Sequence, residues 1–134
     1  MAILRSKINP SSDEWKVESA GTWAVEGVQA NQKTQQVIAE RGLDIHDHRS
    51  RSVSKEMLDS FNLILTMEPG HKEALQIEFP EVAGRVYLLS EMIGLAFTIL
   101  DPVGGRIEDY RATAHEIEHI MSDGFEKIAR LAKA

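Results

Sequence analysis

The segment HEIEH (residues 115–119) has residue types and a spacing that could support metal chemistry. Two histidines four positions apart on a helix, with a glutamate after the first, are the signature of zinc proteases. Zinc also needs a third protein ligand, and the residue three places after His119 is Ser122, where the extended protease motif has a glycine. Apolar residues recur at helical spacing along this segment and predict that His115 and His119 face solvent on the opposite side. A charged helix face is therefore favoured over a zinc hydrolase, and we predict no metal and no cofactor.

The loop LDPVGG (residues 100–105) carries a second candidate, the carboxyl group of Asp101. This residue lies between apolar residues and a proline, after an apolar stretch at residues 85–90 that we predict to be a buried strand. A carboxyl group in such a place could have a raised pKa and act as a general acid. Alternatively, Asp-Pro followed by Gly-Gly is a simple turn in which Asp101 bonds its own backbone. The residues taken alone favour the turn.

Two further polar residues lie near the expected ligand crevice. Ser19 lies in an alternating stretch (residues 15–21) that we predict to be a strand, and His48 lies in the motif HDHRSR. Each taken alone is more typical of a hydrogen-bonded loop residue than of a catalyst. Arg49 and Arg51 could attract phosphate, but basic loop residues are usually solvated. The sequence has no glycine-rich phosphate-binding loop of the Walker or dinucleotide type.

The composition of the chain limits the classes of function. Its 134 residues, 43% of them hydrophobic, are enough for one domain spanning residues 1–134. The formal net charge of −6 argues against a nucleic-acid partner, which would favour a basic surface. There is no apolar run of membrane-spanning length and no signal peptide, so we expect no membrane partner and a cytoplasmic protein. The absence of cysteine excludes disulfides, cysteine zinc sites and a thiol nucleophile within the chain.

Strands alternate with helices along the chain, which predicts an α/β fold with a parallel sheet, helices on both faces and a ligand crevice at the carboxyl ends of the strands. Three strands for five helices make a thin sheet, and the first helix begins without a capping residue. Both features lead us to expect that a segment is missing in front of Met1. The predicted strands are residues 15–21, 61–67 and 85–90, and the predicted helices are residues 2–8, 31–41, 54–61, 71–79 and one long helix from about residue 107 to the end.

Six blocks of residues, in this order, resemble the bacterial low-molecular-weight protein tyrosine phosphatases along essentially the whole chain. They are VESAGT, RGLDIHDHRSR, LILTMEPGHKEAL, RVYLLSEM, DPVGG and EDYRAT. The resemblance implies the three-layer phosphotyrosine protein phosphatase I-like fold. In that family an apolar strand comes first, followed by a Cys-x5-Arg-Ser phosphate loop that runs into a helix ending much like AILRSKI. The resemblance therefore implies an N-terminally truncated domain without its first, central strand, its nucleophilic cysteine and its phosphate-binding arginine.

The resemblance also assigns roles to residues of this chain. Asp101 matches the general acid of the family, which reverses the preference for a simple turn. Ser19 and His48 match residues that hydrogen-bond to the phosphate loop and hold its shape. The aromatic wall that often follows the Asp-Pro pair is replaced here by Val103-Gly104, which leaves the substrate preference open. Trp23 is a second candidate for an aromatic wall.

The function implied by the resemblance is hydrolysis of a phosphomonoester, with a phosphorylated protein as substrate, either at phosphotyrosine or at phosphoarginine. As given, the chain is expected to be inactive, and to bind phosphate or another oxyanion only if the loop is restored. The missing central strand would leave a gap of about 9–10 Å with unpaired backbone groups on both sides. We therefore expect that the chain can self-associate through this gap.

Three other functions remain open. A non-catalytic relative could keep the scaffold as a binding or regulatory module. A zinc hydrolase would depend on the HEIEH segment. The related arsenate reductases use further cysteines in the middle of the chain, and the corresponding region here, TMEPGHKE, has none. This last function is therefore less favoured.

Overall fold

The structure, a computed structural model, describes residues 1–8, 15–21 and 25–133. These residues form two compact units. The first unit comprises Met1–Ser52 and Pro102–Glu118, and the second comprises Val53–Asp101 and His119–Ala134. Within the described part of the chain, no helix combines the length and the apolar character that crossing a membrane requires.

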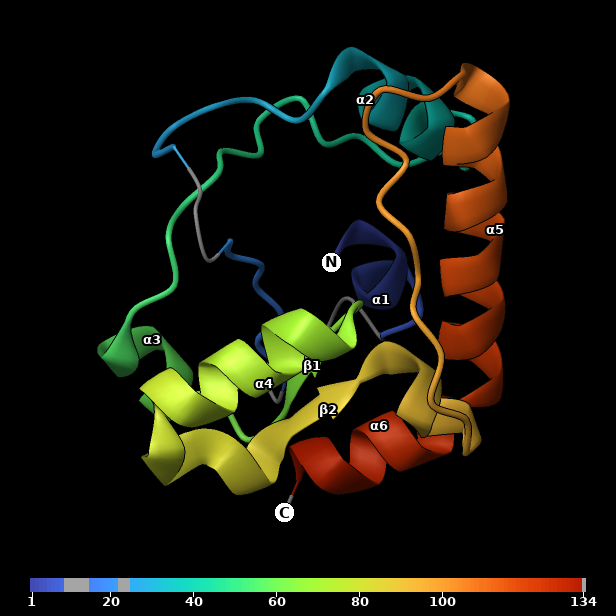
Figure 1. Cartoon of the computed structure of the whole chain (residues 1–134). Helices are drawn as coiled ribbons and strands as arrows, with labels where there is room; N and C mark the ends of the chain where they lie inside the picture. The colour runs from blue at the N-terminus through green and yellow to red at the C-terminus, as the bar shows by residue number, and fades with distance from the viewer. Residues whose placement is uncertain (9–14, 22–24, 134) are drawn as a thin grey trace. The chain divides into compact units, whose positions relative to one another are not determined.

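The second unit contains a parallel pair of strands, β1 (Ile64–Thr66) and β2 (Val86–Leu88). Ile64 lies opposite Val86, and Thr66 lies opposite Leu88. Parallel strands need a crossover connection, and here it consists of α4 (Pro69–Glu78) and the 3₁₀ helix η1 (Pro80–Arg85). Helix α4 packs against both strands (Figure 1). The predicted α/β class with a parallel sheet is confirmed.

Apolar side chains from the crossover and the strands form the core of the second unit. Leu75 of α4, Val82 of η1 and Val86 of β2 are at most 5% exposed, and they cluster with Leu58 of α3 (Lys55–Asp59). Ser54 accepts a hydrogen bond from the Met57 amide and so caps α3, as its sequence predicts. Ile64 of β1 also packs against this cluster, so the strands, the crossover and α3 share one core.

The first unit contains α1 (Ala2–Ser6) and α2 (Gln32–Ala39), which confirms the two predicted helices in this part of the chain. The Asn31 side chain accepts a hydrogen bond from the Lys33 amide at 2.8 Å and caps α2. Gly42, with a φ of +75°, follows the end of the helix. Among the described residues of this unit, the buried ones come from α1, α2 and the first part of α5 (Ile107–Asp123), and they are Ile3, Leu4, Val37, Ile38, Tyr110 and Ala114.

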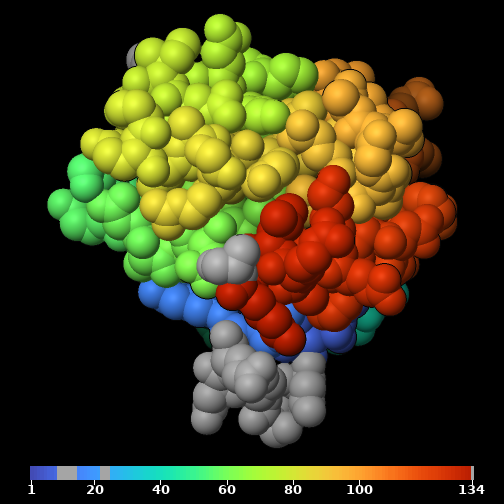
Figure 2. Space-filling model, turned by 90° about the horizontal axis from the view of Figure 1, so that it is seen from below, coloured from blue at the N-terminus to red at the C-terminus, as the bar shows by residue number. Residues whose placement is uncertain are grey.

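The prediction of one long final helix is wrong, because the chain forms two helices separated at Gly124. These are α5 and α6 (Phe125–Ala132). A Cβ atom at Gly124 would lie only 2.8 Å from Cβ of Met92 and 2.9 Å from the Met92 carbonyl oxygen. Met92 belongs to the 3₁₀ helix η2 (Leu89–Ile93), which α6 contacts. In Figure 2, α6 in red lies at the surface beside the yellow and orange residues of this part of the chain.

The predicted strand at residues 15–21 is also wrong, because only Gly21 forms a β-bridge, with Ser52. Arginine side chains hydrogen-bond to two carbonyl groups of this segment. Arg5 Nε donates to the Val17 carbonyl oxygen at 3.1 Å, and Arg51 Nε donates to the Ser19 carbonyl oxygen, also at 3.1 Å. A backbone carbonyl that is satisfied by a side chain needs no neighbouring strand. The alternating pattern therefore produces an extended segment without a ladder.

Candidate active site

Asp101 follows a segment that is bonded to the end of β1. The amide of Ile99 donates to the carbonyl oxygen of Met67 at 3.0 Å, and the Ile99 side chain is 2% exposed. Since Met67 directly follows β1, this bond places the segment at the carboxyl end of the strand, which is where parallel sheets carry their ligand sites. Asp101 lies two residues further along the chain and is exposed.

Two apolar residues near Asp101 in the sequence are exposed. Leu100 is 72% exposed, and Val103 is 71% exposed. The apolar neighbours Ile99, Leu100 and Pro102 were the reason to expect a desolvated carboxyl group. Of these, Ile99 is buried, whereas Leu100 faces solvent. Asp101 itself is also an exposed residue.

A turn follows Asp101 in the chain. The Gly105 amide donates to the Pro102 carbonyl oxygen at 2.8 Å, and Gly104 has a φ of +84°. A Cβ atom at Gly105 would lie 2.6 Å from Oδ2 of Asp109, which accepts a hydrogen bond from the Arg106 amide at the start of α5. The two glycines are therefore needed to join this loop to the helix.

Ser19 is half-buried and lies beside the beginning of α1. Its hydroxyl group contacts Sδ of Met1 at 3.6 Å, and its carbonyl oxygen accepts the bond from Arg51. Arg51 also forms an ion pair of 3.1 Å with Glu18. The expectation that Arg51 is merely solvated is therefore wrong, because its guanidinium group fixes the backbone on which Ser19 lies.

His48 is also half-buried, and its surroundings disfavour a charged imidazole. Burial lowers the pKa of His48 below the ordinary value. Charge repulsion lowers this pKa further, and it comes from the Met1 amino group and from the guanidinium groups of Arg5, Arg51 and Arg49. Burial lowers the pKa of the Met1 amino group in the same way. Ser19 thus contacts the Met1 side chain, and His48 is repelled by the charge of the Met1 amino group. The structure therefore brings these two predicted residues to the same end of α1.

The two histidines of the HEIEH segment lie on α5. His115 and His119 are exposed on α5, as predicted, and Nε2 of His119 lies 3.2 Å from Oδ2 of Asp123. Among residues 1–8, 15–21 and 25–133, no group of three or more histidine, aspartate or glutamate side chains is placed to hold a metal ion. Trp23, the second candidate for an aromatic wall, lies outside the described residues.

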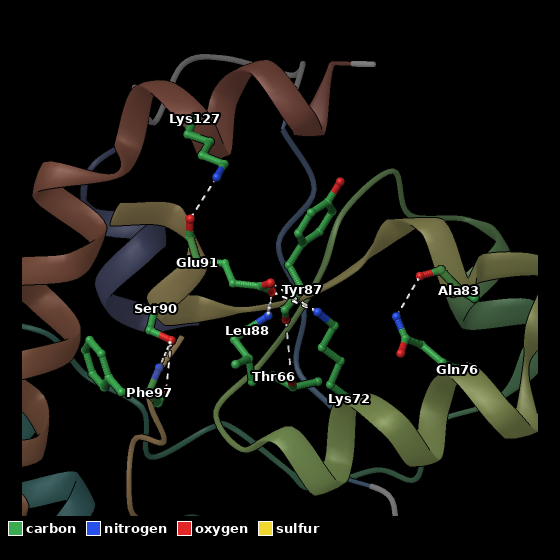
Figure 3. Close-up of polar contacts among 10 residues, drawn as sticks. All are labelled: Thr66, Lys72, Gln76, Ala83, Tyr87, Leu88, Ser90, Glu91, Phe97 and Lys127. Atoms are coloured by element: carbon green, nitrogen blue, oxygen red, sulfur yellow. Dashed lines mark hydrogen bonds and ion pairs between the residues drawn. The ribbon is translucent and has the colours of Figure 1, made fainter. Parts of the chain in front are cut away.

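Two sets of contacts near the candidate residues have no signal in the sequence. Arg5 and Arg51 hold the segment of Ser19 although they lie 12 and 32 residues away from their acceptors. Ser90 holds the chain that leads to Asp101 (Figure 3). Both sets are contacts between distant residues, and neither has a local pattern in the sequence.

A parallel α/β unit with an exposed acidic residue beyond the end of a strand is typical of proteins that carry a ligand site at that edge of the sheet. The family model described as low molecular weight phosphotyrosine protein phosphatase matches residues 2–134. The chain belongs to this family.

Three similar proteins show the range within the family. A protein-arginine-phosphatase of Geobacillus stearothermophilus is 35% identical over 128 residues, which cover 95% of this chain and 84% of the relative. The low molecular weight protein-tyrosine-phosphatase PtpB of Staphylococcus haemolyticus is 33% identical over 105 residues, which cover 78% of this chain and 74% of the relative. A solved structure of the YwlE arginine phosphatase, with serine in place of cysteine and a phosphorylated active-site serine, superposes with a TM-score of 0.88 at 26% identity and covers 96% of this chain and 84% of its own.

Proposed function

We propose that this chain is the scaffold and general-acid part of a phosphatase that removes phosphate from phosphorylated arginine in proteins. The match of the family model to residues 2–134 carries the proposal. The arginine phosphatase of Geobacillus stearothermophilus, which is similar over 95% of this chain, supports phosphoarginine as the substrate. Cytoplasmic location is part of the same proposal, and fractionation of the source cells tests it.

Phosphotyrosine is the second candidate substrate, and the similarity to PtpB supports it. Phosphotyrosine offers an aromatic ring for stacking, and stacked rings contribute about 0.5–1.5 kcal/mol. Val103 cannot provide such stacking, because it is an aliphatic residue at the position that follows the Asp-Pro pair. Substrate preference therefore has to be measured with both phosphorylated side chains.

The reaction proceeds in two displacements. A thiolate attacks phosphorus, the bond from phosphorus to the leaving nitrogen or oxygen breaks, and the carboxyl group of Asp101 gives its proton to the leaving atom. Water then attacks the phosphocysteine, the Asp101 carboxylate takes a proton from that water, and the sulfur leaves with release of inorganic phosphate. The chain contains no cysteine, so turnover requires a thiolate supplied from outside these 134 residues.

Two protein samples test this proposal. The 134-residue chain alone should not turn over p-nitrophenyl phosphate, phosphoarginine or phosphotyrosine. A nucleophile-supplied form, in which a family strand and Cys-x5-Arg-Ser loop are fused in front of Met1, should hydrolyse phosphoarginine with a higher kcat/KM than phosphotyrosine. The reverse order would make phosphotyrosine the substrate. A folded but inactive nucleophile-supplied form would favour the non-catalytic binding module instead.

Substitution of the proposed acid tests its role in the nucleophile-supplied form. Asp101→Asn should lower kcat/KM by about 10²–10⁴-fold, which is the usual contribution of a general acid. The matched control is Asp123→Asn, because Asp123 is an exposed carboxylate that pairs with His119 on α5. Equal activity of the two variants would exclude Asp101 as the acid.

A further inference from the structure

Ser90 carries a buried hydroxyl group that forms two hydrogen bonds with the backbone of a residue further along the chain. The residue lies in η2 and is 1% exposed. Its Oγ donates to the carbonyl oxygen of Phe97 at 2.8 Å and accepts a hydrogen bond from the amide of Phe97 at 3.1 Å. Figure 3 shows both bonds converging on the one hydroxyl group. The donor and the acceptor capacity of Ser90 are therefore both used on one residue seven positions away.

The segment between these residues is held at both ends. Behind η2, the amide of Gly94 donates to the Glu91 carbonyl oxygen at 3.0 Å and the amide of Leu95 donates to the Ser90 carbonyl oxygen at 3.2 Å. Two residues after Phe97, the amide of Ile99 bonds to the residue that follows β1. Residues 94–99 thus run from η2 to the end of β1, and Asp101 is the second residue beyond this fixed stretch.

The turn that carries Ser90 is itself anchored to two helices. Nζ of Lys72, on α4, lies 3.1 Å from both carboxylate oxygens of Glu91, and the Leu88 amide donates to Oε2 of Glu91 at 2.6 Å. Nζ of Lys127, on α6, donates to the Glu91 carbonyl oxygen at 2.8 Å. These bonds, drawn in Figure 3, fix the backbone on which the Ser90 hydroxyl group lies.

We propose that Ser90 is a positioning residue for Asp101: its hydroxyl group fixes residues 94–99 on η2, so that Asp101 is presented at the carboxyl end of β1. This inference rests on the proposed function, because it assigns Ser90 to the group that acts as general acid. Deleting the hydroxyl group would leave the amide and carbonyl groups of the half-buried Phe97 without this partner, and polar backbone groups that are partly shielded from water lose stability when a partner is removed. The segment should then open locally and Asp101 should lose its fixed orientation.

The first test uses the 134-residue chain as it is. Ser90→Ala should accelerate amide hydrogen exchange at Phe97 and Ile99. The acceleration there should be at least about tenfold greater than the acceleration at the α4 amides. The side-chain couplings of Asp101 in NMR spectra should shift toward rotamer averaging. Ser90→Thr, which keeps a hydroxyl group, should restore slow exchange. The matched control is Ser60→Ala, because it removes an exposed hydroxyl group that donates to the Met57 carbonyl oxygen at 2.7 Å.

Unchanged exchange at Phe97 in Ser90→Ala, or an equal acceleration everywhere, would overturn the proposal. If Ser90→Ala does not fold, exchange in the unmodified chain at low urea concentrations decides the question. The proposal is supported if the Phe97 amide exchanges only when the β-strand amides also open. Exchange through an independent local opening at 94–99 contradicts it.

The second test uses the nucleophile-supplied form and a signature of proton donation. A misplaced acid harms a poor leaving group most, so Ser90→Ala should lower kcat/KM for phenyl phosphate about tenfold more than for p-nitrophenyl phosphate. Equal losses for both esters would assign Ser90 a structural role only and overturn the proposal. Absence of turnover in the unsubstituted form would reject the proposed function, while the exchange experiment would still decide whether Ser90 holds the segment of Asp101.

Discussion

Lys72 and Glu91 form a bidentate ion pair in which Nζ of Lys72 lies 3.1 Å from each carboxylate oxygen of Glu91. The pair joins α4 to η2, and both side chains are largely shielded, with exposures of 24% and 27%. Burial alone would raise the pKa of Glu91, but the bond from the Leu88 amide and the bond and charge of Lys72 lower it, so that the resulting pKa lies below the ordinary value. The charged form is therefore the one that the folded state stabilises.

Glu91→Gln should destabilise the protein at neutral pH by about 1–2 kcal/mol, because charge-assisted hydrogen bonds are replaced by weaker neutral ones. Since folding lowers the pKa, this stabilisation is complete above the ordinary glutamate value of about 4.3 and is lost as the pH falls through the lower value of the folded state. Urea unfolding at pH 7 and near pH 3 measures the difference. Glu73→Gln, at an exposed position on the same helix as Lys72, is the control. A deficit that persisted unchanged at acid pH would contradict this account.

Gly124→Ala should lower the free energy of unfolding by about 1–3 kcal/mol, the usual cost of overpacking. Its Cβ atom would lie 2.8 Å from Cβ of Met92 and 2.9 Å from two backbone carbonyl oxygens, so the break between α5 and α6 would have to shift. Gly84→Ala is the matched control, because a Cβ atom at Gly84 would meet nothing within 4 Å. Thermal unfolding of both variants measures the effect, and similar melting temperatures would show that the Gly124 contact can relax at no cost.

The helices could be predicted because their signals are local. Asn31 and Ser54 accept hydrogen bonds from amides two and three residues ahead, and Gly42 comes three residues after the last residue of α2. The position of Asp101 beyond a buried strand was also readable, because alternation of strands and helices fixes which end of the sheet a loop follows.

The predictions that failed depend on distant partners. Alternation at residues 15–21 indicates an extended backbone, but a strand also needs a neighbour, and here Arg5 and Arg51 supply the hydrogen bonds instead. Likewise, the apolar spacing continues on both sides of Gly124 and therefore predicts one helix. The break between α5 and α6 at Gly124 reflects its close contact with Met92. The role of Ser90 becomes visible only when the path of residues 94–99 is known.

Val103→Tyr should raise the kcat/KM of the nucleophile-supplied form for phosphotyrosine relative to phosphoarginine. Val103 is 71% exposed in the loop after Asp101, so a larger side chain meets no packing restraint there. A ring at this position could stack on the substrate ring, and about 0.5–1.5 kcal/mol of stacking corresponds to a gain of about 2- to 10-fold. Val103→Leu is the control, because it adds bulk without a ring. Equal gains for the two variants would indicate contact area rather than stacking.

Substitution of His48 should change how stability depends on pH. Burial, followed by the charges of the Met1 amino group, Arg5, Arg51 and Arg49, lowers its pKa in the folded state. The unfolded chain then binds a proton more readily, so the wild-type protein loses stability as the pH falls from the ordinary histidine value of about 6.5 toward the lower folded value. His48→Gln cannot take up that proton and should lose less stability between pH 7.5 and pH 5.5, as measured by the midpoint of urea unfolding.

His46, two residues before His48, provides an internal comparison of opposite sign. Its imidazole is exposed, and the hydrogen bond and charge of Asp44, with the charge of Asp47, raise its pKa. A raised pKa gives stability that is present below the ordinary value and is lost as the pH rises through the folded value. His46→Gln should therefore steepen the loss of stability on acidification, whereas His48→Gln should flatten it. Parallel shifts in the two variants would mean that the positive groups around His48 do not control its protonation.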